Sequence, residues 1–125
     1  MKLRKWSQSD DVLNQYIKSG IIIRKATLEG DYQTNNKEGR IITQLFKYLE
    51  KNLELANNTL PLLFDNENVV TRTKAAAHCI ALKIQVNEAE KILEEASQDG
   101  SNGIFGFNAK ITLKVWREQG YLKVY

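Results

Sequence analysis

The sequence predicts an all-α protein with a single domain. Apolar residues recur at intervals of three and four positions along most of the chain, which is the spacing of one face of an α-helix. Between turn signals, no alternation of apolar and polar residues runs long enough to indicate a β-strand. The chain has 125 residues, 42% of them hydrophobic, which is enough for one compact core and too little for two, so we expect one domain over residues 1–125.

The first helix is expected to begin at Ser9, a capping residue, with the acids Asp10 and Asp11 in its first turn. Its apolar side consists of Leu13, Tyr16, Ile17, Gly20 and Ile21. A glycine within such a stripe lowers helix propensity, so we interpret Gly20 as a point where another backbone approaches closely. The helical pattern is interrupted at residues 30–31.

A second helix is predicted from about Lys37 to the polar residues 57–59. Its apolar positions are Ile41, Ile42, Leu45, Phe46, Leu49 and Leu53. We expect the two long helices to form an antiparallel hairpin. A brief apolar turn follows at residues 60–64, where Pro61 suits the first turn of a helix.

Three shorter helices are predicted in the second half of the chain. Asn68 is expected to cap the first of them and Asn87 the second. The last helix, about Phe107 to Glu118, is apolar around most of its circumference, so we expect it at the centre of the second-half core. Gly120 is expected to end it.

Composition and charge exclude several classes of protein. Lys and Arg number 18 against 15 Asp and Glu, and the resulting charge of +3 is small for a dedicated nucleic-acid wrapper. Apolar runs are short, such as Ile21 to Ile23, and residues 1–6 lack the apolar stretch of a secretory signal. We therefore expect a cytoplasmic protein with no membrane partner.

The chain has few residues suited to catalysis or to holding a cofactor. Its one cysteine, Cys79, cannot form an internal disulfide, and one histidine cannot complete a Cys/His zinc site. Adjacent helical positions point about 100° apart, so His78 and Cys79 do not converge as a base and a nucleophile. We expect Cys79 in the core and His78 at its boundary or exposed. We predict no enzymatic activity, no metal and no cofactor.

The segment Leu62 to Ala76 resembles a HEAT-type repeat, in which a short helix ends at an Asp/Asn-rich turn and the next helix carries an Arg shortly before two alanines. The matching residues are Asp65, Arg72, Ala75 and Ala76, although Thr71 stands where a valine is usual. The resemblance implies structural roles for Asp65 and Arg72 at the junction. We expect Arg72 to form a bond or ion pair there and Lys74 to be exposed.

More of the chain resembles an uncharacterised bacterial family, domain-of-unknown-function family twenty-nineteen. The motifs are residues 27–31 (TLEGD), the block from Asp65 to Ala76, residues 107–113 (FNAKITL) and Gly120. They span about Ala26 to Gly120. The resemblance implies an all-helical, HEAT-like fold, a right-handed stack of antiparallel helix pairs with about five to six helices, and no established enzymatic activity.

Because the chain offers no catalytic constellation, we expect its surface to carry its function. The predicted acidic face consists of Glu88, Glu90, Glu94, Glu95 and Asp99. Small bacterial helical proteins of this kind often act as immunity proteins, and an acidic surface suits the basic cleft of a nuclease toxin. We therefore predict a protein partner, a cognate secreted toxin domain, although this interpretation is an analogy between classes.

Two other functions stay open from the sequence. A basic stripe on the second helix favours a nucleic-acid-binding helical-repeat protein, and it consists of Lys37, Arg40, Lys47 and Lys51. Lys2, Arg4 and Lys5 form a second basic cluster beside Trp6, which is able to stack on a base. A homo-oligomeric structural module is the third possibility, with an exposed apolar end at Tyr121, Leu122, Val124 and Tyr125.

Overall fold

The computed structural model describes residues 8–125, and every regular element in that range is helical. The α-helices are α1 (Ser9–Glu29), α2 (Tyr32–Glu50), α3 (Leu53–Thr59), α4 (Val69–Leu82), α5 (Val86–Gln98) and α6 (Ile104–Gln119). Short 3-10 turns lie at Leu60–Leu63 and Gly100–Asn102. The all-α prediction is confirmed, with six α-helices in the described range. None of the helices within residues 8–125 has the length and apolar character needed to cross a membrane.

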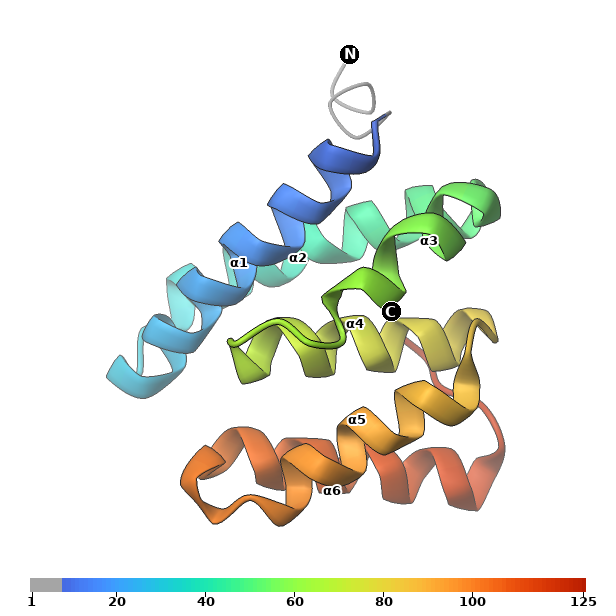
Figure 1. The fold of residues 1–125 in the computed structure, drawn as a ribbon. Helices are drawn as coiled ribbons and strands as arrows, with labels where there is room; N and C mark the ends of the chain where they lie inside the picture. The colour runs from blue at the N-terminus through green and yellow to red at the C-terminus, as the bar shows by residue number, and fades with distance from the viewer. Residues whose placement is uncertain (1–7) are drawn as a thin grey trace.

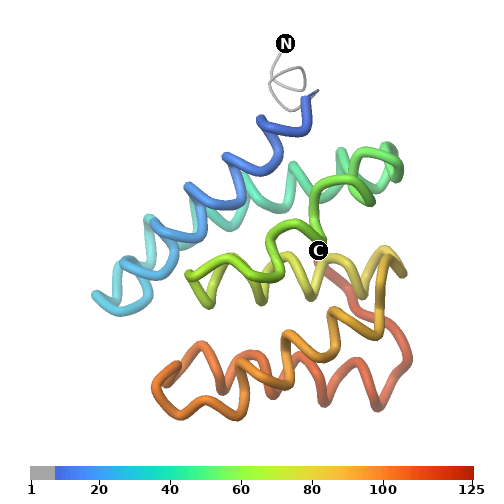
Figure 2. Tube along the Cα trace, viewed as in Figure 1, coloured from blue at the N-terminus to red at the C-terminus, as the bar shows by residue number. Residues whose placement is uncertain are grey.

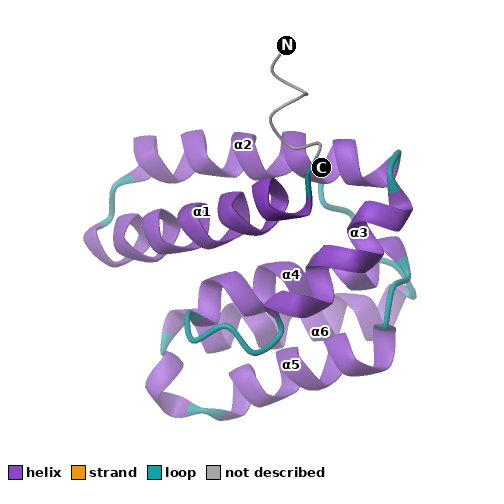
Figure 3. Cartoon of the chain, turned by 45° about the horizontal axis from the view of Figure 1, so that its top comes forward, coloured by secondary structure: helices purple, strands orange, loops and turns teal. Residues whose placement is uncertain are grey.

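The helices are arranged in chain order (Figures 1 and 2). The antiparallel pair α1–α2 lies on one side and the pair α5–α6 on the other, with α4 between them and α3 beside α4 (Figure 3). The expected hairpin of two long helices is therefore confirmed. Within residues 8–125, α6 packs on α5 and to a lesser extent on α4.

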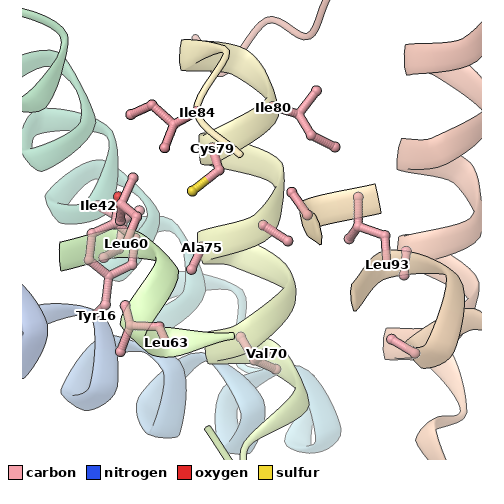
Figure 4. Packing of buried hydrophobic residues seen from close by; sticks show 14 of the residues in the cluster. Tyr16, Ile42, Leu60, Leu63, Val70, Ala75, Cys79, Ile80, Ile84 and Leu93 are labelled. Atoms are coloured by element: carbon pink, nitrogen blue, oxygen red, sulfur yellow. The ribbon is translucent and has the colours of Figure 1, made fainter. Parts of the chain in front are cut away.

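Helix α4 is buried on two sides and forms the centre of the core. Its residues Ala75 and Cys79 point toward the α1–α3 layer, where Tyr16 lies (Figure 4). On the opposite side, Ile80 points toward Leu93 of α5. All five side chains are essentially inaccessible to solvent. The small residues of α4 therefore join both layers into one apolar cluster, and the expected core position of Cys79 is confirmed.

Local hydrogen bonds explain where α2 begins and ends, which the sequence analysis placed incorrectly. The Asp31 carboxylate accepts from the backbone N–H of Thr34 at 3.1 Å, so the helix begins at Tyr32 and not near Lys37. At its other end, the Asn52 side-chain amide donates to the Tyr48 carbonyl at 2.8 Å. This bond takes up a carbonyl of the last turn and separates α2 from α3, which the sequence analysis had merged into one helix.

The structure confirms some of the other predicted helix caps and contradicts others. Asn68 caps α4, because its side-chain oxygen accepts from the N–H of Val70 at 2.9 Å. Gly120 ends α6 in the left-handed conformation, with φ of 80°. The predicted caps at Ser9 and Asn87 are wrong, because both residues lie inside the first turn of their helices. The preceding residues, Gln8 and Gln85, occupy the cap positions without a side-chain capping bond.

Gly20 marks the closest approach of α1 to α4. A Cβ atom at this position would lie 1.9 Å from Thr71 Oγ1 and 3.3 Å from Thr71 Cα. The expected close approach is confirmed, and much of the contact is made by the threonine side chain. Ile21, which was expected on the same buried side, is exposed because α4 covers only the Gly20 side of this turn.

Helix α6 is the outermost helix, so its expected position at the centre of the second-half core is wrong. Phe105, Ala109 and Leu113 face inward and are buried, whereas Phe107 and Ile111 face solvent. A helix that is apolar all round indicates burial on several sides only when neighbours are present on several sides. Within residues 8–125, α6 packs mainly on α5 and leaves its other side uncovered.

Candidate protein-binding surface

An exposed apolar stripe runs along the outer side of α6. It consists of Ile104, Phe107, Ile111 and Val115, whose exposures range from 38% at Val115 to 57% at Phe107. At 100° per residue these four positions lie within about a quarter of the circumference, opposite the buried face. Single exposed apolar residues are ordinary, but a continuous row on one helix is typical of an interaction surface.

A groove separates this stripe from α5. Its volume is about 760 Å³, and its lining includes Ser97 and Gln98 of α5 together with Phe107, Ile111 and Lys114 of α6. The α5 wall is polar, and the α6 wall alternates apolar side chains with charged ones, which are Lys110, Lys114, Arg117 and Glu118. This combination suits a partner that presents an apolar residue at its centre and polar groups around it.

Two residues of the predicted acidic face contact α6. Glu90 accepts from Trp116 Nε1 at 2.8 Å and lies 3.6 Å from the Arg117 guanidinium, and its side chain is only 28% exposed. Glu94 accepts from Arg117 at 2.7 Å and its side chain stays 41% exposed. A fully solvated position is therefore wrong for Glu90, whereas Glu94 remains partly open to solvent. They hold α5 against α6 because Trp116 and Arg117 extend across the interface between the two helices.

The other three acids of that face remain available to a partner. Glu88, Glu95 and Asp99 are exposed. Glu88 and Glu95 lie seven residues apart and share one side of α5, and Asp99 directly follows the helix. Within residues 8–125, Glu88 and Glu95 make no hydrogen bond or ion pair, and Asp99 bonds locally to Ser101. Those bonds lower the pKa of Asp99, so its charge is retained in mildly acidic solution. We call these three residues the acidic edge.

The predicted basic stripe is intact on α2. Lys37, Arg40, Lys47 and Lys51 are all exposed. None of them makes an ion pair within the described part of the chain, and the Lys47 ammonium lies 4.6 Å from the centre of the Tyr125 ring. The second basic cluster, Lys2, Arg4 and Lys5 with Trp6, lies outside the described residues.

The C-terminal tail folds back on α2, so it is not the free apolar end that the third hypothesis requires. The Tyr125 hydroxyl donates to the Glu50 carboxylate, and its ring lies 6.0 Å from the Phe46 ring, centre to centre. Leu122 and Val124 are half-buried, and Leu122 packs against the core. Tyr121 remains exposed. Part of the apolar surface of the tail is therefore covered by contacts with the rest of the chain.

The two residues to which the HEAT resemblance gives structural roles, Arg72 and Asp65, differ in their exposure to solvent. Arg72 is half-buried, and its guanidinium donates to the carbonyls of Asn66 and Glu67, each at 3.0 Å. Asp65 is exposed. Lys74 was expected to be exposed but is half-buried, because α1 and α6 lie on either side of it.

We expect Arg72→Ala to lower the free energy of unfolding by about 1.5–3 kcal/mol, because two backbone carbonyls lose a charged donor. Arg72→Lys is expected to restore part of the lost free energy of unfolding, since an ammonium can reach one carbonyl without reproducing the planar geometry of the guanidinium. The matched control is Lys91→Ala on the exposed side of α5, with an expected change within about 0.5 kcal/mol. Equal denaturant midpoints for Arg72→Ala and Lys91→Ala would contradict this role.

His78 is buried, contrary to the expectation that it lies at the boundary or exposed. It is 3% exposed, and its Nδ1 forms a hydrogen bond of 2.7 Å with the Tyr16 hydroxyl. Its ring also packs on Phe46, with ring centres 4.8 Å apart. Burial, and to a lesser extent the charge of Lys74, lowers the pKa of His78 to about 3. Burial also raises the pKa of Cys79 to about 12, which keeps the thiol protonated and unreactive at neutral pH.

The apolar character of the last helix was predicted from the sequence, because its apolar residues occupy most of the circumference. Which side of the helix stays uncovered within residues 8–125 is a tertiary property. No group of three or more His, Cys, Asp or Glu side chains within residues 8–125 is arranged to hold a metal ion.

No family model, curated protein or solved structure matches this chain.

Proposed function

We propose that this chain is a non-enzymatic protein-binding module that docks a partner protein on the outer face of α6. The observation that carries the proposal is the exposed stripe of Ile104, Phe107, Ile111 and Val115, directly opposite the buried face of the same helix. Transferring these side chains from water to an interface would supply an apolar centre for binding. The neighbouring α5, held by the Glu90 and Glu94 contacts, would supply a fixed polar rim.

The exposed charges of α5 indicate the chemistry of the partner. Glu88, Glu95 and Asp99 are three exposed carboxylates outside the lining of the groove, so a partner that also extends over this part of α5 with basic groups would gain both affinity and association rate. The basic cleft of a nuclease has this character. The proposal accordingly includes an immunity role in the bacterial cytoplasm, in which a right-handed, HEAT-like stack of helix pairs presents this rigid face to a cognate toxin domain.

Co-expression with the product of the adjoining reading frame, followed by co-purification, tests the docking surface. The double variant Phe107→Asp/Ile111→Asp is expected to abolish the complex while preserving the helical circular-dichroism spectrum, because both residues are exposed. Charge reversal of the acidic edge (Glu88→Lys, Glu95→Lys, Asp99→Lys) is expected to slow association, with a loss that increases at low salt. A complex that survives both sets of substitutions would refute the docking surface.

Nucleic-acid binding through α2 remains the second candidate, because its four basic residues are exposed and free of ion pairs within residues 8–125. The matched variant for the same experiment is Lys37→Glu/Lys51→Glu, which changes charge on α2 and leaves α5 and α6 untouched. We expect it to leave the protein complex unchanged. If DNA or RNA is retained instead, lost steeply with added salt and lost in this variant, the nucleic-acid function is correct.

A further inference from the structure

A second, narrower groove lies between α1 and α6, with α4 as its floor. Its volume is about 170 Å³, and its lining includes Ile23, Thr27, Lys74, Phe105, Asn108 and Thr112. It is distinct from the groove between α5 and α6, because the two have no lining residue in common. A cavity of about 150 Å³ is known to hold a six-carbon ring, so this groove suits a ligand of about six to eight non-hydrogen atoms.

The Lys74 ammonium in the floor of this groove lacks a compensating partner. Within residues 8–125, no hydrogen bond or ion pair reaches it, and no Asp or Glu lines the groove. Burial lowers the pKa of Lys74, which is the sign of a cation without sufficient solvation. His78, four residues along α4, is neutral at physiological pH and supplies no negative charge.

The rest of the lining combines hydrogen-bonding groups with apolar surface. Thr27 lines the groove, and its hydroxyl oxygen accepts from the Asn35 side-chain amide at 2.9 Å. The Asn108 side chain lies at the groove on α6. Ile23 and Phe105 form the apolar walls, and the Arg24 guanidinium lies 5.8 Å from the centre of the Phe105 ring at the margin. One half-buried cation, neighbouring hydroxyl and amide groups, and apolar walls match an anion with a short hydrocarbon chain.

We propose that this groove binds a small monocarboxylate, with the carboxylate on the Lys74 ammonium and a short apolar chain against Ile23 and Phe105. The carboxylate would provide the ion pair that Lys74 lacks. The proposal does not depend on the protein-docking function, because it uses neither the outer stripe of α6 nor the acidic edge.

Sodium butanoate, titrated at constant ionic strength into the ¹⁵N-labelled protein, is the direct probe. We expect saturable shifts at the groove residues of α1, α4 and α6, with a Kd on the order of 1 mM for so small a ligand. Lys74→Met is expected to weaken binding by about tenfold or more. Lys91→Met, which removes an exposed lysine on α5, is the matched control and is expected to change the Kd by less than about twofold.

Two further arms test the shape and the chemistry of the site. Ala77→Leu narrows the groove while keeping the lysine, so it is expected to weaken butanoate binding as strongly as Lys74→Met does. 1-Butanol, which has no charge, and inorganic phosphate, which has no apolar chain, are expected to bind at least about tenfold more weakly than butanoate. Equal binding of either compound would overturn the proposal. Two other results would also overturn the proposal. One is binding of a blocked glutamyl peptide without binding of free butanoate, and the other is the absence of any saturable shift on addition of butanoate.

Discussion

Acidification from pH 6.5 to pH 3.5 is expected to destabilise the fold by up to about 4 kcal/mol through His78 alone. Burial, with a smaller contribution from the Lys74 charge, lowers the pKa of His78 from 6.5 to about 3 in the folded protein. Between these two values the unfolded chain binds a proton that the folded chain does not bind. Stability therefore falls as the pH falls through this window, by about 1.4 kcal/mol per pH unit.

The matched variant for this prediction is His78→Asn. Its side-chain carbonyl can accept from the Tyr16 hydroxyl in place of Nδ1, and it does not titrate. We expect the variant to be less stable at pH 7, because it loses ring packing on Phe46, and to show a correspondingly weaker dependence on pH. Urea titrations at several pH values measure both free energies of unfolding.

A spectroscopic test of the same claim does not depend on a variant. His78 is the only histidine of the chain, so its imidazole resonances are unambiguous. We expect them to stay unshifted from pH 8 to about pH 4.5 in the folded protein. A midpoint near 6.5 would show that the imidazole titrates freely and would contradict its burial against Tyr16 and Phe46.

Gly20→Ala and Gly39→Ala are expected to change stability in opposite directions. The added methyl at Gly20 would meet Thr71 Oγ1 at 1.9 Å, so we expect a loss of about 1–3 kcal/mol. At Gly39, inside α2, no atom beyond the local chain lies within 4 Å of the added methyl. The same substitution there is expected to raise stability by about 0.5–1 kcal/mol through helix propensity.

A double-mutant cycle identifies the atom responsible. Thr71→Ala removes the conflicting Oγ1, a buried hydroxyl that has no hydrogen-bond partner among the described residues, and leaves Cβ at 3.1 Å. We expect Gly20→Ala to cost less in this background, with a favourable coupling energy of about 1 kcal/mol. If the two substitutions lower the free energy of unfolding additively in thermal or urea unfolding, Thr71 Oγ1 is not the cause of the Gly20 effect.

The helices themselves were largely predictable because local periodicity and capping chemistry determine them. The spacing of Leu45 and Leu49, and the cap at Asn68, each follow from neighbours within a few residues. The division between α2 and α3 was missed because it lies in the non-helical backbone of Asn52 (φ −138°, ψ 63°), whose side chain also bonds to the Tyr48 carbonyl. Nothing in the apolar spacing distinguishes that bond from a continuing helix.

The candidate surfaces were less predictable, because exposure depends on which helices lie next to one another. Glu90 and Glu88 look alike in the sequence, and only the position of Trp116 across the α5–α6 interface makes one of them structural. Lys74 has a weak signal, since it stands four residues after the buried Val70. Its place in a groove still depends on α1 and α6, which are distant from it in the chain.

Hydrogen exchange on the complex with the adjoining reading frame's product tests the proposed docking surface most directly. We expect slower amide exchange in residues 104–115 of α6 and along the acidic edge of α5, and unchanged exchange in α2. Equal protection throughout the chain would indicate general stabilisation without a localised interface. Protection confined to α2, with residues 104–115 unchanged, would contradict the assignment of the α6 stripe as the protein-binding face.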